Sequence, residues 1–267
     1  MGELLSVDGV CKGFFRGETY VGVLKDVSFS VRTRGVVAIT SRRRLAGKTT
    51  LLEIVTGMQT PDSGTVMLDG REVRPPLRGW RASLDARRGR PAAPRLGHDI
   101  VWVSSTGPHR ELEVSKYVGS PLAIHGRGDV RRLAAAALDR VGAQNLIGRS
   151  WGELSDWQRA LVGLARGFAG RPQLVVIDDL LDWHDSSETE ELSELLHTLI
   201  EEAERPCAVL LTAGQEAGIV LADELWSITP AGTLVRRSGP RHNNDDATIL
   251  PFPTHSEKQG SRRTGSG

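Results

Sequence analysis

Residues 36–52 read VVAITSRRRLAGKTTLL, an apolar run followed by a basic loop and then by Gly-Lys-Thr-Thr-Leu-Leu. The apolar run 36–40 predicts a buried strand, and residues 47–58 predict a helix. A strand, a loop and a helix that opens on Gly-Lys-Thr make up the Walker A pattern, in which backbone N–H groups at the helix N-terminus face phosphate groups. The segment therefore predicts a phosphate-binding site on an α/β scaffold.

The loop of this segment departs from the pattern. Arg42 and Leu45 stand where the pattern places glycines. Residues with a Cβ are disfavoured by about 1–2 kcal/mol in the left-handed backbone conformations that glycine adopts freely, so we expect a distorted phosphate cradle. The guanidinium groups of Arg42, Arg43 and Arg44 can replace the lost N–H donors by binding phosphate. A loop of three solvated arginines is the alternative, and the sequence leaves both open.

Composition limits the partners of the chain. It has 267 residues, with 34 Lys and Arg against 33 Asp and Glu. Because these charges nearly cancel, no overall field favours nucleic acid or an anionic membrane as the main partner. Cys11 and Cys207 are far apart in the sequence and predict neither a disulfide nor a metal site, which fits a reducing cytosol. No run of about 18 apolar residues occurs, so we expect no membrane-spanning helix here.

The opening third of the sequence is rich in predicted strands. Short apolar runs are separated by Gly, Asp and Pro turns, a pattern typical of β structure. These runs are residues 4–7, 27–31 and 65–68. Residues 71–97 are rich in Arg, Pro, Gly and Ala without a clear period, and they predict a long surface loop.

The remaining sequence alternates strands with helices, which indicates an α/β sheet. The predicted elements are the strands 100–103, 173–177 and 208–212 and the helices 130–141, 155–168 and 187–203. The region of about residues 106–168 is predicted to be an inserted helical subdomain. Residues 237–267 are polar and rich in Gly, Ser and Pro, so we expect a disordered tail after a domain that spans residues 1–236.

Several segments occur in a fixed order around the Walker A pattern. They are DVSFSV at 26–31, GKTTLL at 47–52, PDSGTV at 61–66, LDG at 68–70, LS at 154–155, QRALVGLAR at 158–166 and LVVIDD at 174–179. In this order they resemble the nucleotide-binding subunit of an ABC transporter over roughly residues 3–236. The resemblance implies an α/β P-loop NTPase fold of ABC type. In that fold a mixed β-sheet core carries an antiparallel β subdomain and an inserted helical subdomain.

The resemblance assigns roles to matching residues and implies ATP and Mg²⁺ as ligands. Lys48 is expected to reach the β- and γ-phosphates, and Thr49 and Asp178 are expected to hold Mg²⁺, Asp178 through water. Phe15 or its neighbour Phe14 can supply the aromatic ring that stacks on adenine, although two adjacent aromatics are equally typical of core packing. The predicted nucleotide-binding residues are Gly47, Lys48, Thr49, Thr50, Arg42, Arg43, Arg44, Phe15, Asp178 and Ser155.

The residues expected to support hydrolysis are replaced. Asp179 stands where the family has the glutamate that polarises the attacking water, and its carboxylate is one methylene shorter. The family's glutamine after strand 100–103 is replaced by Ser104-Ser105, and its switch histidine is replaced by Ala213. Because catalysis of phosphoryl transfer depends mainly on geometry, we expect weak hydrolysis, with Asp179 as the candidate catalytic residue.

The segment that the family offers to the nucleotide of a second subunit is also altered. The family's Leu-Ser-Gly-Gly-Gln is Leu-Ser-Asp-Trp-Gln at residues 154–158. Ser155 is retained, but Asp156 brings negative charge towards a triphosphate and Trp157 crowds the site. We therefore expect a poor ATP clamp. Asp185 matches the aspartate that contacts the partner across the dimer, and an acidic helix start is the alternative interpretation.

These observations predict an ATP-binding subunit that couples ATP binding, with weak or lost hydrolysis, to transport through separate transmembrane permease subunits. Such a subunit lies in the cytoplasm, at the inner face of the cell membrane. We expect a heterodimer with a second, competent ABC ATPase, and a homodimer is the other option. The alternative function is a pseudo-ATPase, a structural or regulatory subunit that uses no nucleotide. Action on nucleic acid is not expected, because such ABC proteins usually carry two cassettes in one chain.

Overall fold

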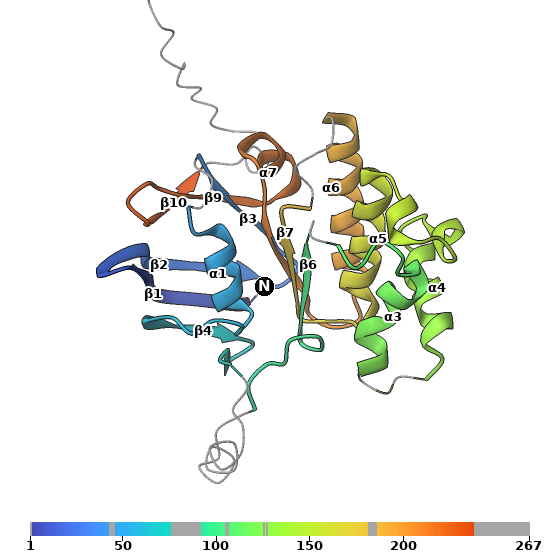
Figure 1. Ribbon diagram of the computed structural model, residues 1–267, viewed down its shortest axis with the longest axis horizontal. Helices are drawn as coiled ribbons and strands as arrows, with labels where there is room; N and C mark the ends of the chain where they lie inside the picture. Colours follow the sequence, from blue (N-terminus) through green and yellow to red (C-terminus); the bar gives the residue numbers. More distant parts are fainter. Residues whose placement is uncertain are drawn as a thin grey trace, which may run out of the picture.

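The computed structural model describes residues 2–42, 46–75, 92–104, 107–124, 126, 128–180 and 186–237. Within these residues the chain forms a six-stranded sheet, a four-stranded antiparallel sheet and a set of helices, drawn in Figure 1. The expected α/β fold is confirmed. Most of the predicted loop 71–97 and nearly all of the predicted tail 237–267 lie outside the described residues.

Strand β3 (Val36–Ser41) lies inside the six-stranded sheet. The spatial order is β10 (Leu234–Arg237), β9 (Glu224–Ile228), β3, β8 (Ala208–Thr212), β7 (Leu174–Asp178) and β6 (Ile100–Ser104). Strand β3 is parallel to β8 and β9, strand β7 is parallel to β8 and β6, and β10 is antiparallel to β9. Because neighbouring parallel strands end at the same edge of a sheet, the residues that follow β3, β8 and β7 meet there.

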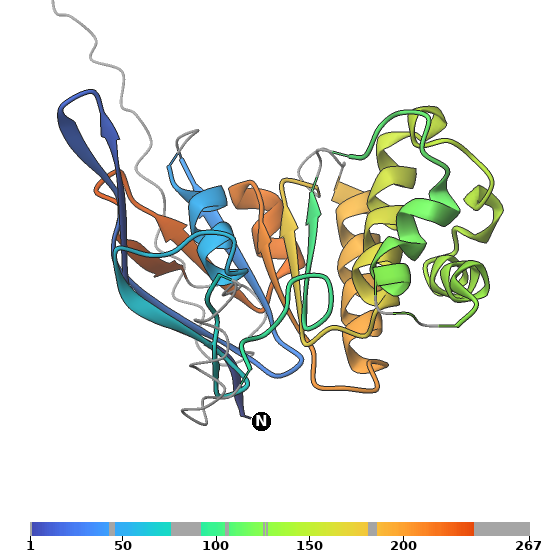
Figure 2. The same ribbon diagram turned by 60° about the horizontal axis from the view of Figure 1, so that its bottom comes forward.

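Both faces of this sheet are covered, which explains why its central strands are apolar throughout. Side chains of β3 alternate between two cores: Val36 and Ala38 belong to the core on the helical side, and Val37 and Ile39 belong to the other core. Figure 2 shows the helical side and the antiparallel sheet on opposite sides of the strands. The period-2 alternation therefore divides one strand between two layers.

The antiparallel sheet and helix α1 (Lys48–Val55) cover the second face. The strands of this sheet are, in order, β2 (Thr19–Arg32), β1 (Glu3–Arg16), β4 (Ser63–Leu68) and β5 (Arg71–Glu72). Strands β1 and β2 form one long hairpin, longer than the separate short strands that the sequence predicts. Helix α1 ends before the predicted residue 58 because Thr56 caps it and Gly57 turns the chain with a φ of 74°.

Helices cover the first face. They are α3 (Val114–Ile124), α4 (Val130–Asp139), α5 (Asp156–Ala169), α6 (Ser186–Glu201) and α7 (Gln215–Leu221), with short 3-10 turns η1 (Gln144–Leu146) and η2 (Trp151–Glu153). Helix α3 packs against α4 and α5, and α5 packs against β6. Helix α3 was not predicted as a separate helix, and its interior Pro121 is unfavourable in a helix. Among the described helices, none has the length and apolar character needed to cross a membrane.

Candidate nucleotide site

The residues predicted to bind phosphate and Mg²⁺ meet where three neighbouring strands end. Lys48 and Thr49 begin α1 after the loop that follows β3, Asp178 ends β7, and Thr212 ends β8. Strand β8 lies between β3 and β7 in the sheet. The strand order therefore brings together residues that are more than 100 positions apart in sequence.

Two contacts join helix α1 to the acidic pair that follows β7. Lys48 Nζ lies 3.1 Å from Asp179 Oδ1. The Thr49 hydroxyl donates to Asp178 Oδ2 at 3.3 Å. The Lys48 and Asp179 side chains are 19% and 46% exposed, so this ion pair faces solvent. An ion pair of this exposure contributes about 0–1 kcal/mol to stability and can be exchanged for another partner.

Thr212 completes the network. Its hydroxyl lies 2.9 Å from Asp178 Oδ1 and 3.0 Å from Asp179 Oδ1. The backbone N–H of Asp179 donates to the same hydroxyl oxygen at 2.8 Å. We refer to Lys48, Thr49, Asp178, Asp179 and Thr212 as the α1 cluster. Ala213 is marked by its place in the sequence pattern, but Thr212 was not predicted to belong to the site. The sequence signal that points to Thr212 is its place at the end of a buried strand.

The two carboxyl groups of the α1 cluster differ in surroundings. Asp178 is 9% exposed. Burial raises the pKa of its carboxyl group, and the negative charge of Asp179 raises it further; hydrogen bonds from Thr212 and Thr49 and the Lys48 charge oppose this shift. Asp179 has a φ of 49°, in the left-handed region that costs a non-glycine residue about 1–2 kcal/mol. The chain thus turns sharply immediately after Asp178.

The N-terminus of α1 is suited to phosphate. Gly47 has a φ of 97° and no side chain to cap the helix, and the first turn contains no acidic residue. A Cβ on Gly47 would lie 2.7 Å from Val23 Cγ1, so glycine is required for this close packing on β2. The first N–H groups of a helix have no intrahelical acceptor and, with the helix dipole, attract anions. Thr50, half-buried in the same turn, supplies one of them.

The oxygen atoms beside this helix start are suited to Mg²⁺. The Thr49 hydroxyl and the Asp178 carboxylate are adjacent, and both are hard oxygen ligands of the kind that Mg²⁺ prefers. A bound Mg²⁺ would neutralise charge that develops on transferred phosphate. Described residues contain no group of three or more His, Cys, Asp or Glu side chains that could hold a metal. Magnesium generally keeps several water or phosphate oxygens as ligands and takes only one or two oxygens from the protein.

Other predicted residues lie outside this network. Arg42 is exposed directly after β3, while Arg43, Arg44 and Asp185 lie outside the described residues. Ser155 caps helix α5: its hydroxyl accepts from the Gln158 N–H at 3.2 Å. Ser155 therefore sits in the helical region and is not part of the α1 cluster. Its predicted contact, with the nucleotide of a second subunit, stays a prediction.

The two candidate aromatic residues point to opposite faces of the β1–β2 hairpin. Phe15 is 74% exposed, and its ring packs edge-on against Tyr20 at a centroid distance of 5.4 Å. Phe14 pairs with Val21 on the other face of the hairpin. The pairing is irregular at Val23, where Lys12 pairs with Leu24 and Gly13 pairs with Gly22. The contact of Val23 with Gly47 therefore does not decide between Phe14 and Phe15.

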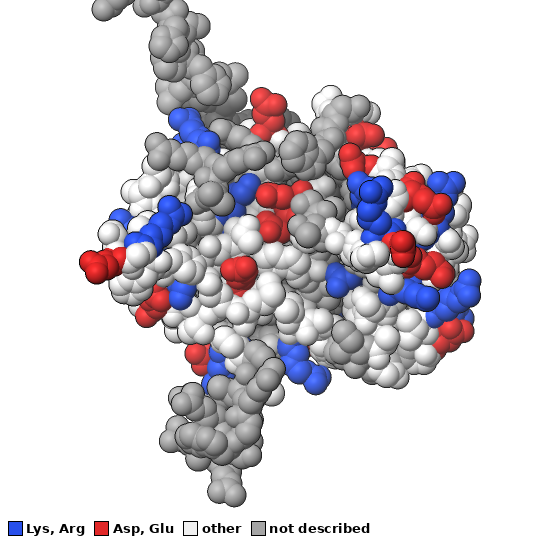
Figure 3. Space-filling view, viewed as in Figure 1, with Lys and Arg blue, Asp and Glu red and all other residues white. Residues whose placement is uncertain are grey.

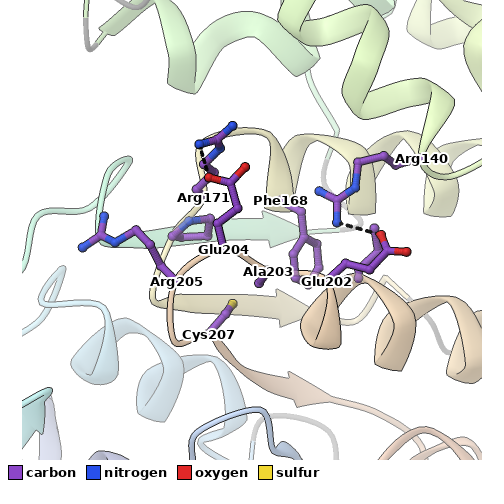
Figure 4. A pocket seen from close by; sticks show the side chains of 10 residues that line it. Arg140, Phe168, Arg171, Glu202, Ala203, Glu204, Arg205 and Cys207 are labelled. Atoms are coloured by element: carbon purple, nitrogen blue, oxygen red, sulfur yellow. Dashed lines mark hydrogen bonds and ion pairs between the residues drawn. The ribbon is translucent and has the colours of Figure 1, made fainter.

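A separate cavity of about 210 Å³ lies near the opposite ends of β7 and β8 and has a different character. Figure 4 shows Arg171 paired with Glu204 and Arg140 paired with Glu202, the latter at 3.4 Å. Burial raises the pKa of the Cys207 thiol to about 12, so this sulfur stays protonated and a weak nucleophile. The cavity contains none of the predicted nucleotide-binding residues.

Comparison with known proteins places the chain in a family. A family model described as ABC transporter matches residues 24–181. The methionine import ATP-binding protein MetN 1 of Rhodococcus jostii is 28% identical over 257 residues, covering 94% of this chain and 73% of that protein. The Fe(3+) ions import ATP-binding protein FbpC of Pseudomonas fluorescens is 30% identical, covering 76% of this chain and 55% of that protein. The chain thus spans about half the length of the second relative.

Solved structures agree at the level of the fold. A dimeric ATP-binding cassette in a post-hydrolysis state, bound to ADP and Pi, superimposes with a TM-score of 0.72 at 21% identity, covering 90% of this chain and 100% of that one. The cbiO1 protein of Clostridium perfringens, part of the ABC transporter complex cbiONQ, gives a TM-score of 0.67 at 18% identity and 87% coverage of each chain. This chain belongs to the ABC transporter family, as an ATP-binding domain.

Proposed function

We propose that this chain binds Mg-ATP at the α1 cluster and couples that binding, with weak hydrolysis, to transport through separate permease subunits. The observation that carries the proposal is the meeting of Lys48 and Thr49 with Asp178 where β3, β8 and β7 end. Lys48 would bind the β- and γ-phosphates, and the N–H groups at the start of α1 would bind the same phosphates. Thr49 and Asp178 would hold Mg²⁺.

The same network supports weak hydrolysis. Asp179 is the candidate group for orienting the attacking water, and its carboxylate already contacts Lys48 and Thr212. Lys48 must leave Asp179 to reach phosphate, so ATP binding competes with this ion pair. Ala213, at the position of the switch histidine, is fully buried and has no side-chain donor for a γ-phosphate. Loss of one such donor in a catalytic site costs about 100- to 1,000-fold in rate.

The proposed partners are transmembrane permease subunits and a second, competent ABC ATPase. Support comes from the relatives, whose names identify them as import ATP-binding proteins. The chain would then lie at the inner face of the cell membrane. Its charges favour no polyanionic partner: Figure 3 shows basic and acidic side chains interspersed over one face of the molecule. A heterodimer is proposed because a homodimer would contain two sites with replaced catalytic residues.

Protection against thermal unfolding tests this function. We expect Mg-ATP to raise the Tm of the wild-type chain, because a ligand that binds the folded state alone at 100 times its Kd adds about 2.7 kcal/mol of stability. Lys48→Ala should abolish the rise. Lys116→Ala, which removes an exposed lysine from α3, should retain it. An equal rise in the wild type and the Lys48→Ala variant would contradict the proposed phosphate site.

A pseudo-ATPase is the second candidate, and one observation favours it. Both α1 groups that would bind nucleotide already have acidic partners within the chain, Lys48 with Asp179 and Thr49 with Asp178. If these contacts are permanent, the chain keeps the fold as a structural or regulatory subunit. No rise in Tm at millimolar Mg-ATP, in either the wild type or the Lys48→Ala variant, would support this function.

A further inference from the structure

Thr212 has no role in the motifs that identify the family fold, yet it occupies the centre of the α1 cluster. It is the last residue of β8, it pairs with Ile39 of β3, and it is fully buried. Buried hydroxyl groups are found with hydrogen-bond partners because an unsatisfied one costs about 1–3 kcal/mol. Among the described residues, the hydrogen-bond partners of this hydroxyl are Asp178 and Asp179.

The direction of the Thr212 hydrogen follows from these partners. The hydroxyl oxygen accepts the Asp179 backbone N–H at 2.8 Å, so its own hydrogen points elsewhere. Asp178 Oδ1 at 2.9 Å and Asp179 Oδ1 at 3.0 Å are its two acceptors. A hydroxyl group has one hydrogen to donate. The two carboxylates therefore share a single donor, and a strong bond to one weakens the bond to the other.

The other partners of the two carboxylates come from α1. Asp178 accepts from Thr49 through its second oxygen, Oδ2, whereas Asp179 uses the same oxygen, Oδ1, for Lys48 and Thr212. Nucleotide and Mg²⁺ would draw Lys48 and Thr49 away from these oxygens. Thr212 is on a buried strand and stays in place. It is thus the partner that both carboxylates keep when the site is filled.

We propose that Thr212 is a positioning residue. It fixes the orientation of Asp178 towards Mg²⁺ and of Asp179 towards the water that would attack the nucleotide. This inference rests on the proposed function. Its physical basis is that a hydrogen bond to a charged group is about twice as strong as one between neutral groups.

Removal of the hydroxyl should act on the Mg²⁺-dependent part of ATP binding. Thr212→Val keeps the shape of the side chain and removes its hydrogen bonds to both carboxylates. Binding through Lys48 and the α1 N–H groups needs no Mg²⁺ and should change little. We expect the ratio of Kd in EDTA to Kd in Mg²⁺ to fall by about ten-fold or more, the range for a lost hydrogen bond to a charged group.

Calorimetric titration of the full chain with ATP, in Mg²⁺ and in EDTA, measures this ratio. Thr212→Ser, which keeps the hydroxyl, should retain most of the Mg²⁺ effect. The matched control is Thr40→Val: Thr40 is buried near the end of the adjacent strand β3 but donates to the Trp226 carbonyl at 3.2 Å. Should the valine variant not fold, Thr212→Ala serves in its place, since it adds no methyl group beside the carboxylates.

The outcomes separate this inference from the proposed function. A Mg²⁺ effect in Thr212→Val equal to that in Thr40→Val would overturn the inference while the proposed function stands. A loss of the effect in Thr212→Ser as large as in Thr212→Val would also overturn it, because the hydroxyl would then not be the active group. A wild-type chain that binds no ATP in either buffer overturns both.

Discussion

Two clusters in this protein each place a lysine beside an aspartate, and the carboxyl groups respond in opposite ways. Near the turn of the β1–β2 hairpin, Asp62 accepts from Lys12 Nζ at 2.9 Å, the Gly13 N–H at 2.8 Å and the Tyr20 hydroxyl at 2.8 Å. These bonds lower the pKa of Asp62 to about 2. In the α1 cluster, burial and the neighbouring Asp179 raise the pKa of Asp178 instead.

The difference lies in the balance of charge and donors. Asp62 has its own lysine and two further donors, so its charge is satisfied and the cluster is a structural clamp. Asp178 and Asp179 share the one hydrogen of Thr212; Asp178 also accepts from Thr49, and Lys48 pairs with Asp179. Among the side chains of the α1 cluster, two carboxyl groups thus stand beside one lysine. A cluster with more carboxyl groups than basic groups is typical of a cation-binding site. Functional sites of this kind commonly lower the stability of the folded protein.

Neutralising Asp178 should give the largest effect. With Asp178→Asn we expect the Mg²⁺-dependent gain in ATP affinity to fall about 10- to 100-fold, the range for loss of a group that orients a metal. The ligand-free Tm should rise, because a raised pKa means that the folded chain disfavours the charged carboxylate. Calorimetric titration and thermal scans measure both. An unchanged Mg²⁺ effect together with a lower Tm would show that the cluster is a clamp like that of Asp62.

Alanine variants of Phe14 and Phe15 test whether the hairpin supplies the ring that stacks on adenine. Base stacking on an aromatic ring is worth about 1–3 kcal/mol, so losing the stacking ring should weaken ATP binding by about ten-fold. Phe14 and Phe15 lie on opposite faces of the hairpin, so we expect this loss in only one of the variants Phe14→Ala and Phe15→Ala, and a change of less than about two-fold in the other. Competition binding with a fluorescent ATP analogue compares the two variants. Equal affinities in both variants and the wild type would contradict stacking of adenine on this hairpin.

Removing the acidic partner of Lys48 should have a smaller effect, and it should raise ATP affinity. Asp179→Asn removes the competitor for the Lys48 ammonium. Because an exposed ion pair is worth about 0.2–1 kcal/mol, ATP affinity should rise by up to about five-fold. Glu72→Gln is the matched control, since Glu72 forms an exposed ion pair with Arg74 on the antiparallel side, at 3.8 Å. If ATP affinity falls in Asp179→Asn and stays unchanged in the control, the Lys48–Asp179 pair does not oppose binding.

The stability that ionised Asp62 contributes should be lost in acid. A carboxyl group with a lowered folded-state pKa adds stability that is complete above its unfolded pKa and is lost as the pH falls through the folded value. For Asp62 this window runs from 3.8 down to about 2. We expect Asp62→Asn to lower the Tm at pH 6 and the difference from wild type to shrink as the pH approaches 2. Thermal scans at pH 6, 4 and 3 measure it; a constant difference would rule out the ionised clamp.

The residues of the phosphate site were predicted from the sequence, but the strand order that brings them together was not. The strand, loop and helix around Lys48 follow from local patterns, and Asp178 is marked by the apolar run before it. The position of β8 between β3 and β7 cannot be predicted from local patterns, because spatial strand order differs from sequence order. Thr212 was missed for that reason: its importance depends on which strands flank it. Helix α3 was missed because Pro121 interrupts its helical pattern.

The hairpin aromatics show a second limit. Two adjacent residues on a strand point to opposite faces, so the sequence alone could not separate Phe14 from Phe15 without knowledge of which face packs on α1. The contact of Val23 with Gly47 does not supply that knowledge, because the pairing of the two strands is irregular at Val23. Motifs identify residue types and their order, whereas the pairing of strands decides which side chain meets the nucleotide.

Equilibrium binding of Mg-ATP to the purified chain by calorimetry, with Lys48→Ala beside the wild type, tests most directly whether the α1 cluster is a nucleotide site. We predict saturable binding to the wild type and none to Lys48→Ala, with Lys116→Ala binding like the wild type. Equal binding by wild type and Lys48→Ala, or no binding by the wild type at millimolar Mg-ATP, would contradict it.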